Sequence, residues 1–218
     1  MSKTYYPIFA DLHGRSCLVV GGGAIAQRKV AALLACGASI TIVSPMVTRT
    51  LAAYAAQGRI RHRARRFAPS DLKGAWLACA ATDDQRINER VCAAASARRI
   101  FVNVVDQPPL CSFIAPAIVR RGPLTIAIST GGASPSLAKQ LRRELRAAVG
   151  PEYGTMARLL GTLRVAAKRR LPRYHDRKRY FGALVTGRAF RLVRAGQPAA
   201  ARREALAQLA HESNRPRR

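Results

Sequence analysis

The stretch Ser16-Cys-Leu-Val-Val-Gly-Gly-Gly-Ala-Ile-Ala26 decides the fold of this 218-residue chain. A short apolar run stops at three glycines, which is typical of a buried strand that ends in a tight turn. Residues 24–35 follow as a helix rich in alanine and leucine, and Gly37 is placed to close it as the C′ residue. A second apolar run over residues 38–43 predicts the next strand. Strand, helix and strand form one βαβ unit.

The alternation of strands and helices continues to residue 105. It predicts a helix over 47–57, a strand over 59–67, an apolar strand over 75–81, a helix over 84–98 and a strand over 100–105. Apolar strands that alternate with helices belong to parallel sheets covered on both faces. We therefore predict an α/β fold with an N-terminal Rossmann-type sheet. The basic run over 61–66 favours a solvated edge strand.

Beyond residue 112 the pattern changes to two strands, 112–119 and 123–129, with a turn between them, and then to helices. A helix over 135–149 has one apolar face, and four later leucines are predicted core contacts: Leu159, Leu163, Leu206 and Leu209. The pattern divides the chain into three regions: an α/β domain (1–112), a small central α+β region (113–150) and a helical C-terminal region (151–218).

Composition restricts the classes of function. With 38 Lys and Arg against 11 Asp and Glu, the net charge is +27, which attracts nucleic acid, anionic lipid or a polycarboxylate without choosing among them. Five cysteines without a C-x-x-C pair and four scattered histidines predict reduced thiols and no metal site. No secretory h-region and no apolar run approaching the roughly 20 residues of a membrane span is present, so we expect a cytoplasmic protein.

Residues 21–26 match the dinucleotide fingerprint G-x-G-x-x-A, after a strand and at the start of a helix. Gly21 allows the sharp turn, Gly23 lets a pyrophosphate approach the backbone, and Ala26 lets the helix pack on the strand. The helix N-terminus then presents N–H groups to the phosphates. The acidic residue that would hold the ribose hydroxyls is replaced by Ser44-Pro45-Met46, which leaves NAD and NADP both open.

Asp106 directly follows a strand, at the carboxyl ends of the strands, where ligands of open α/β sheets bind. It is either a general base or a carboxylate that caps the turn before Pro108. Asp83 and Asp84, after Thr82, lie at another strand end and either start a helix or contact the cofactor. In the second glycine-rich loop, residues 129–136, Ser134 is the expected N-cap, and hydroxyl and N–H groups there can bind a carboxylate.

These features, in this order, resemble the precorrin-2 dehydrogenase family, which includes the N-terminal half of the sirohaem synthases. The matching stretches are Tyr6-Pro-Ile-Phe9, Cys17-Leu-Val-Val-Gly-Gly-Gly23, Gln27-Arg-Lys29, Trp76-Leu-Ala-Cys-Ala-Ala-Thr-Asp-Asp84, Asn103-Val-Val-Asp106, Ser112-Phe-Ile-Ala-Pro116 and Ser129-Thr-Gly-Gly-Ala-Ser-Pro135.

The resemblance implies NAD-dependent oxidation of precorrin-2 to sirohydrochlorin by a homodimer, with NAD bound by residues 1–112 and with dimerisation and substrate binding in residues 113–150. We expect no nucleic-acid or membrane partner. It places the catalytic aspartate at Asp106 and a substrate loop at Ser129, Thr130, Gly131, Gly132 and Ser134. Cofactor contacts are assigned to Gly21, Gly23, Ala24, Ile25, Pro45, Met46, Thr82, Asp83 and Asn103.

Two alternatives stay open. Some relatives also insert iron into sirohydrochlorin with the same aspartate, so a bifunctional dehydrogenase and ferrochelatase is one of them. The charge of +27 suggests the other, a non-enzymatic NAD-sensing or nucleic-acid-binding protein, although the sequence lacks a helix-turn-helix signature and an aromatic-studded RNA motif. Since the sequence contains no methyltransferase domain, it resembles the short, stand-alone form.

Overall fold

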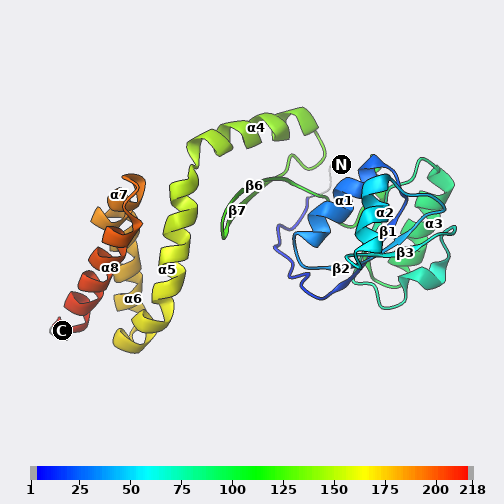
Figure 1. Cartoon of the computed structure of the whole chain (residues 1–218). Helices are drawn as coiled ribbons and strands as arrows, with labels where there is room; N and C mark the ends of the chain where they lie inside the picture. Colours follow the sequence, from blue (N-terminus) through cyan, green and yellow to red (C-terminus); the bar gives the residue numbers. More distant parts are fainter. Residues whose placement is uncertain (1–3, 216–218) are drawn as a thin grey trace. The chain divides into compact units, whose positions relative to one another are not determined.

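The computed structural model describes residues 4–215, which form two compact units divided between Ala115 and Pro116 (Figure 1). The first unit contains a five-stranded sheet of order β3-β2-β1-β4-β5, in which every pairing is parallel. Its strands are β1 Ser16–Val20, β2 Ser39–Val43, β3 Arg61–Arg63, β4 Leu77–Ala80 and β5 Phe101–Val104. The predicted Rossmann-type α/β sheet is confirmed.

Helices cover both faces of this sheet. They are α1 Ala24–Leu34, α2 Arg49–Ala56 and α3 Gln85–Ser96, with short 3-10 turns η1 Pro69–Leu72 and η2 Pro108–Leu110. The buried side chains of α1 and α2 belong to the core cluster on one face, and those of α3 belong to the cluster on the other. Gly37, with φ +73°, closes α1 through the hydrogen bonds of a Schellman motif, from Gly37 N to Leu34 O and from Ala38 N to Leu33 O.

Two buried cysteines, Cys17 and Cys79, are small residues of the core. Cys17 is 1% and Cys79 is 3% exposed, and burial raises the pKa of each thiol to about 11. Both therefore stay neutral and pack as small apolar groups.

The third strand is much shorter than predicted. Only Arg61–Arg63 pair with β2, at the edge of the sheet as expected, because Arg63 and Arg65 turn toward a carboxylate that the sequence did not single out. That carboxylate, Asp71, has a fully buried side chain and accepts hydrogen bonds from both guanidinium groups and from Ala68 N. Burial alone would raise the pKa of Asp71, but these hydrogen bonds outweigh it and lower the pKa to about 2.

The first strand after residue 112 also begins later than predicted. Residues 111–113 instead run along the outer edge of β5, where Ser112 Oγ accepts from Val102 N and Cys111 Sγ accepts from Val104 N. Side chains thus take the place of a strand, and no alternation of hydrophobic residues marks such a segment.

The second unit begins with the antiparallel hairpin of β6 Ala117–Arg121 and β7 Leu124–Ile128, joined at Gly122 and Pro123. Its helices are α4 Pro135–Ala148, α5 Pro151–Arg170, α6 Tyr174–Thr186, α7 Arg188–Arg194 and α8 Pro198–Ser213. A core that includes Leu163 and Leu209 joins α5 to α8, and Leu159 packs against it, as predicted. Leu206 is 38% exposed, so its prediction as a core residue was wrong; it lies on the outer face of α8. No helix among the described residues is long and apolar enough to cross a membrane.

Candidate functional site

The three glycines that end β1 are under different constraints. A Cβ on Gly21, which has φ +114°, would lie 2.1 Å from Ala81 O, and a Cβ on Gly22 would lie 1.9 Å from Met46 O. A Cβ on Gly23 would meet nothing within 4 Å. Gly21 and Gly22 are therefore required by close backbone packing, whereas the space beside Gly23 is open and suits an approaching phosphate group.

The N-terminus of α1 faces this open space without a cap of its own. Gly23 is the N-cap residue, no side chain hydrogen-bonds to the first turn, and no acidic residue lies in that turn. The first N–H groups of a helix need a partner, and they attract anions. A pyrophosphate would satisfy the N–H groups at Ala24 and Ile25, so these residues fit a dinucleotide.

The loop after β2 packs against the glycine turn. Thr48 N donates to Gly22 O, and Ser44 Oγ donates to Met46 O at 2.6 Å. Met46 itself is 82% exposed beside Pro45. The loop is thus held at the backbone while its outer surface stays available to a ligand.

The end of β4 is fixed by a residue that sequence reasoning missed. Asn88, 4% exposed on α3, contacts Thr82 Oγ1 through its Oδ1 atom at 2.9 Å and donates its Nδ2 to Thr82 O. Asp84 is the N-cap of α3 and accepts from Arg86 N and Ile87 N, which confirms it as a helix start, while Asp83 is exposed.

Asp106 lies in the turn directly after β5. It is exposed and has φ +56°, a left-handed conformation that aspartate tolerates better than most residues. Within residues 4–215, no hydrogen bond or ion pair engages its carboxylate, so nothing described supports the turn-capping alternative. A carboxylate of this kind, at the carboxyl edge of the sheet, is available to a ligand.

Asn103, assigned to the cofactor from sequence, is 6% exposed and already engaged by the protein. Its Oδ1 accepts from Lys29 Nζ at 2.7 Å, and its Nδ2 donates to Phe113 O at 3.1 Å. Lys29 lies on α1, 74 positions away, and no local sequence signal connects the two residues.

In the second unit, the glycine-rich loop before α4 is held by its own hydroxyl groups. Ser129 Oγ accepts from Gly131 N, Thr130 Oγ1 accepts from Ser134 N, and Ser134 Oγ accepts from Leu137 N as the predicted N-cap. Gly131 and Gly132 have φ of +64° and +92° and are exposed. The loop is a fixed turn that leaves backbone groups on its surface.

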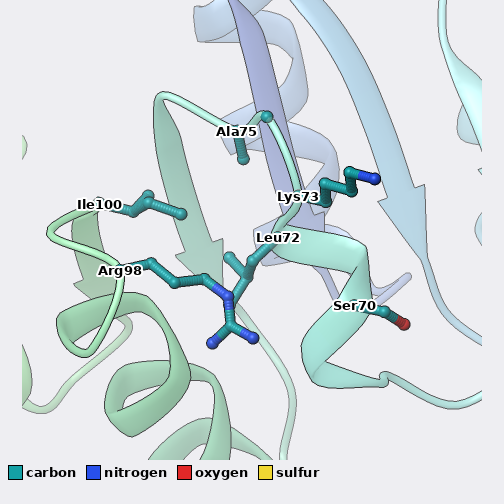
Figure 2. Close-up of a pocket in the computed structure, with 7 residues that line it drawn as sticks. Ser70, Leu72, Lys73, Ala75, Arg98 and Ile100 are labelled. Atoms are coloured by element: carbon teal, nitrogen blue, oxygen red, sulfur yellow. The ribbon is translucent and has the colours of Figure 1, made fainter.

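In the first unit, a cavity of about 470 Å³ lies at the amino-terminal ends of β4 and β5. Ala75 and Ile100, which precede the two strands, line it together with Leu72 and Arg98 (Figure 2). Figure 2 shows Lys73 pointing away from Arg98. The cavity is therefore at the amino-terminal ends of the strands, whereas the glycine turn and Asp106 lie at their carboxyl ends.

Three family models match successive parts of the chain. Residues 8–117 match a putative NAD(P)-binding domain, residues 121–148 the central region of sirohaem biosynthesis proteins, and residues 152–209 the sirohaem synthase dimerisation region. The first of these models indicates a nicotinamide cofactor.

Curated relatives and a solved structure agree with these matches. Siroheme synthase from Methylobacillus flagellatus is 47% identical over 90% of the chain, and siroheme synthase 1 from Pectobacterium atrosepticum is 43% identical over 96%. The chain spans 42% and 44% of the lengths of these two relatives. The structure of SirC, a precorrin-2 dehydrogenase, matches with a TM-score of 0.76 and 30% identity, over 95% of this chain and all of SirC.

Proposed function

Because the chain belongs to the precorrin-2 dehydrogenase and sirohaem synthase family, we propose that it oxidises precorrin-2 to sirohydrochlorin with NAD⁺. One observation carries this proposal. An uncapped helix N-terminus beside Gly23 and the unpartnered carboxylate of Asp106 both lie at the carboxyl ends of the strands of one sheet. The first group suits a dinucleotide, and the second suits proton transfer.

The chain's own residues have distinct tasks in this reaction. The N–H groups at Ala24 and Ile25 bind the pyrophosphate, and Met46 and Pro45 form one wall of the cofactor site. When bound, NAD⁺ supplies the acceptor for the hydride. Asp106 accepts the proton that the macrocycle releases, so that precorrin-2 and NAD⁺ give sirohydrochlorin, NADH and a proton. The net charge of +27 favours a substrate with many carboxylates.

NAD rather than NADP is the proposed cofactor. A 2′-phosphate would require a free cation near the loop after β2. Arg63 and Arg65 of the neighbouring basic run are bound to Asp71, but Arg49, at the start of α2, is exposed, so the family resemblance rather than this loop supports the choice of NAD. Comparison of kcat/KM for the two cofactors tests this choice, and a preference for NADP⁺ would reject it.

We also propose a role for each of three regions. Residues 1–112 bind the cofactor, residues 113–150 bind substrate and contribute to dimerisation, and the helices of residues 151–218 contribute to dimerisation. The last region matches the sirohaem synthase dimerisation region and exposes apolar side chains, including Val165 at 65% and Val185 at 41%. Light scattering on the full chain should give the mass of a homodimer; a monomer at micromolar concentration would reject this part.

The decisive experiment adds precorrin-2 and NAD⁺ to the full chain and follows NADH and sirohydrochlorin absorbance. The Asp106→Asn variant should lose turnover by about 100-fold or more, within the range of general base catalysis. Wild-type turnover in that variant would reject the assignment of Asp106, and absence of NADH with the native chain would reject the activity. A parallel reaction with sirohydrochlorin and Fe²⁺, without NAD⁺, measures the ferrochelatase alternative.

A further inference from the structure

A partly buried cation, Lys29, connects the helix of the glycine turn to the strand that precedes Asp106. Lys29 lies on α1 and Asn103 on β5, and β4 lies between β1 and β5 in the sheet. The 2.7 Å hydrogen bond from Lys29 Nζ to Asn103 Oδ1 therefore extends past β4. Within residues 4–215, no carboxylate lies within ion-pair distance of Lys29, so this amide oxygen is its observed acceptor.

The orientation of the Asn103 side chain follows from its partners. Lys29 can only donate and Phe113 O can only accept, so Oδ1 must face α1 and Nδ2 must face residue 113. The same Nδ2 atom lies 3.5 Å from Cys111 Sγ. Loss of Lys29 would leave a buried amide oxygen without its donor and would free the amide to turn.

Cys111 extends this network to both sides of the Asp106 turn. Its Sγ accepts from Val104 N at 3.2 Å and lies 3.3 Å from Gln107 O, the carbonyl oxygen of the residue that follows Asp106. The thiol is buried. One connected set of polar groups thus begins on α1 and ends on the two backbone segments that flank Asp106.

We propose that Lys29 is a positioning residue for the dehydrogenation: through Asn103 and Cys111, it fixes the Asp106 turn relative to the helix that binds the dinucleotide. The inference rests on the proposed function, in which Asp106 acts as the base. A base displaced by about 1 Å can lose roughly 100-fold in rate, so this connection has a direct kinetic consequence.

The test is a double-mutant cycle of Lys29→Met and Asp106→Asn in the full chain. Lys29→Met keeps the length of the side chain but removes its donor. We expect it to lower kcat by about tenfold or more with KM for NAD⁺ within about twofold, since α1 still presents its N-terminus. In the Asp106→Asn background, the same change should cost less than about twofold, because residues that act through one group are not additive.

Three controls separate the outcomes. Lys73→Met removes an exposed cation at the amino-terminal ends of the strands, away from Asp106, and should behave as wild type. Lys29→Arg keeps a donor and should recover part of the activity lost in Lys29→Met, which also tests the inference if Lys29→Met does not fold. An equal loss in both Asp106 backgrounds, wild-type kcat in Lys29→Met, or no recovery in Lys29→Arg would overturn the inference. Wild-type kcat in Asp106→Asn alone would instead reject the assignment of Asp106 as the base, and absence of NADH with the native chain would reject the proposed function.

Discussion

Replacing each of the three glycines after β1 with alanine should separate a folding role from a binding role. The same methyl group is added each time, but its surroundings differ. At Gly21 it would lie 2.1 Å from Ala81 O in a backbone with φ +114°. At Gly22 it would lie 1.9 Å from Met46 O, and at Gly23 it would lie in open space.

The magnitudes follow from these contacts. The unfavourable φ at Gly21 costs about 1–3 kcal/mol, and the overlap with backbone costs about 1–3 kcal/mol more. For a chain of this length, 1 kcal/mol lowers Tm by about 2–4 °C, so Gly21→Ala should lower Tm by at least about 4 °C. Gly22→Ala should lose stability through the overlap alone. Gly23 has φ −80°, which alanine adopts readily, so Gly23→Ala should change the free energy of unfolding by less than about 1 kcal/mol.

Cofactor affinity should fall most clearly at Gly23, the position where the fold tolerates alanine best. Gly23→Ala should weaken NAD⁺ binding by about tenfold or more, about 1.4 kcal/mol, because the methyl group keeps the pyrophosphate from the backbone N–H groups. Thermal unfolding by circular dichroism and titration calorimetry with NAD⁺ measure the two effects in the same samples. Unchanged NAD⁺ affinity in a folded Gly23→Ala protein would refute the assignment of this space to the cofactor.

Three further outcomes are expected. Asp71→Asn should lower the free energy of unfolding at pH 7 by up to about 2 kcal/mol, an upper bound because its arginine partners are partly exposed. Since the folded pKa of Asp71 is lowered to about 2, this difference should persist down to about pH 4 and disappear as the pH falls toward 2; a constant difference in acid unfolding curves would contradict the assignment. Ser134→Ala should cost about 1 kcal/mol in urea unfolding by removing the cap of α4, and an unchanged urea midpoint would contradict this role. Cys17 and Cys79 should resist a thiol reagent at pH 8, because burial raises the pKa of each to about 11, and rapid modification of either in the native chain would disprove this.

Much of the first unit could be predicted because β1, β2, β4 and β5 are apolar runs that alternate with helices, while the basic β3 has the composition of an edge strand. The glycines at 21 and 37 marked turns that only glycine adopts easily, and both have positive φ in the structure. The alternation was therefore sufficient to place all five strands in one parallel sheet.

What could not be predicted depends on contacts between distant residues. The end of β3 is determined by Asp71, which binds arginines that the sequence suggested were simply solvated. The contact between Lys29 and Asn103 joins residues far apart in the chain. Neither contact produces a periodic pattern, and the family resemblance identified Asp106 without identifying what holds it.

The outer edge of β5 has a consequence for how this sheet stops growing. The N–H groups of Val102 and Val104, which a sixth strand would need, already donate to Ser112 and Cys111. Any extended segment, from the same molecule or another, would have to displace a hydroxyl and a buried thiol before it could add to the sheet. Two short side chains therefore set the number of strands in this unit, and they do so without the charged residues that occupy the opposite edge at β3.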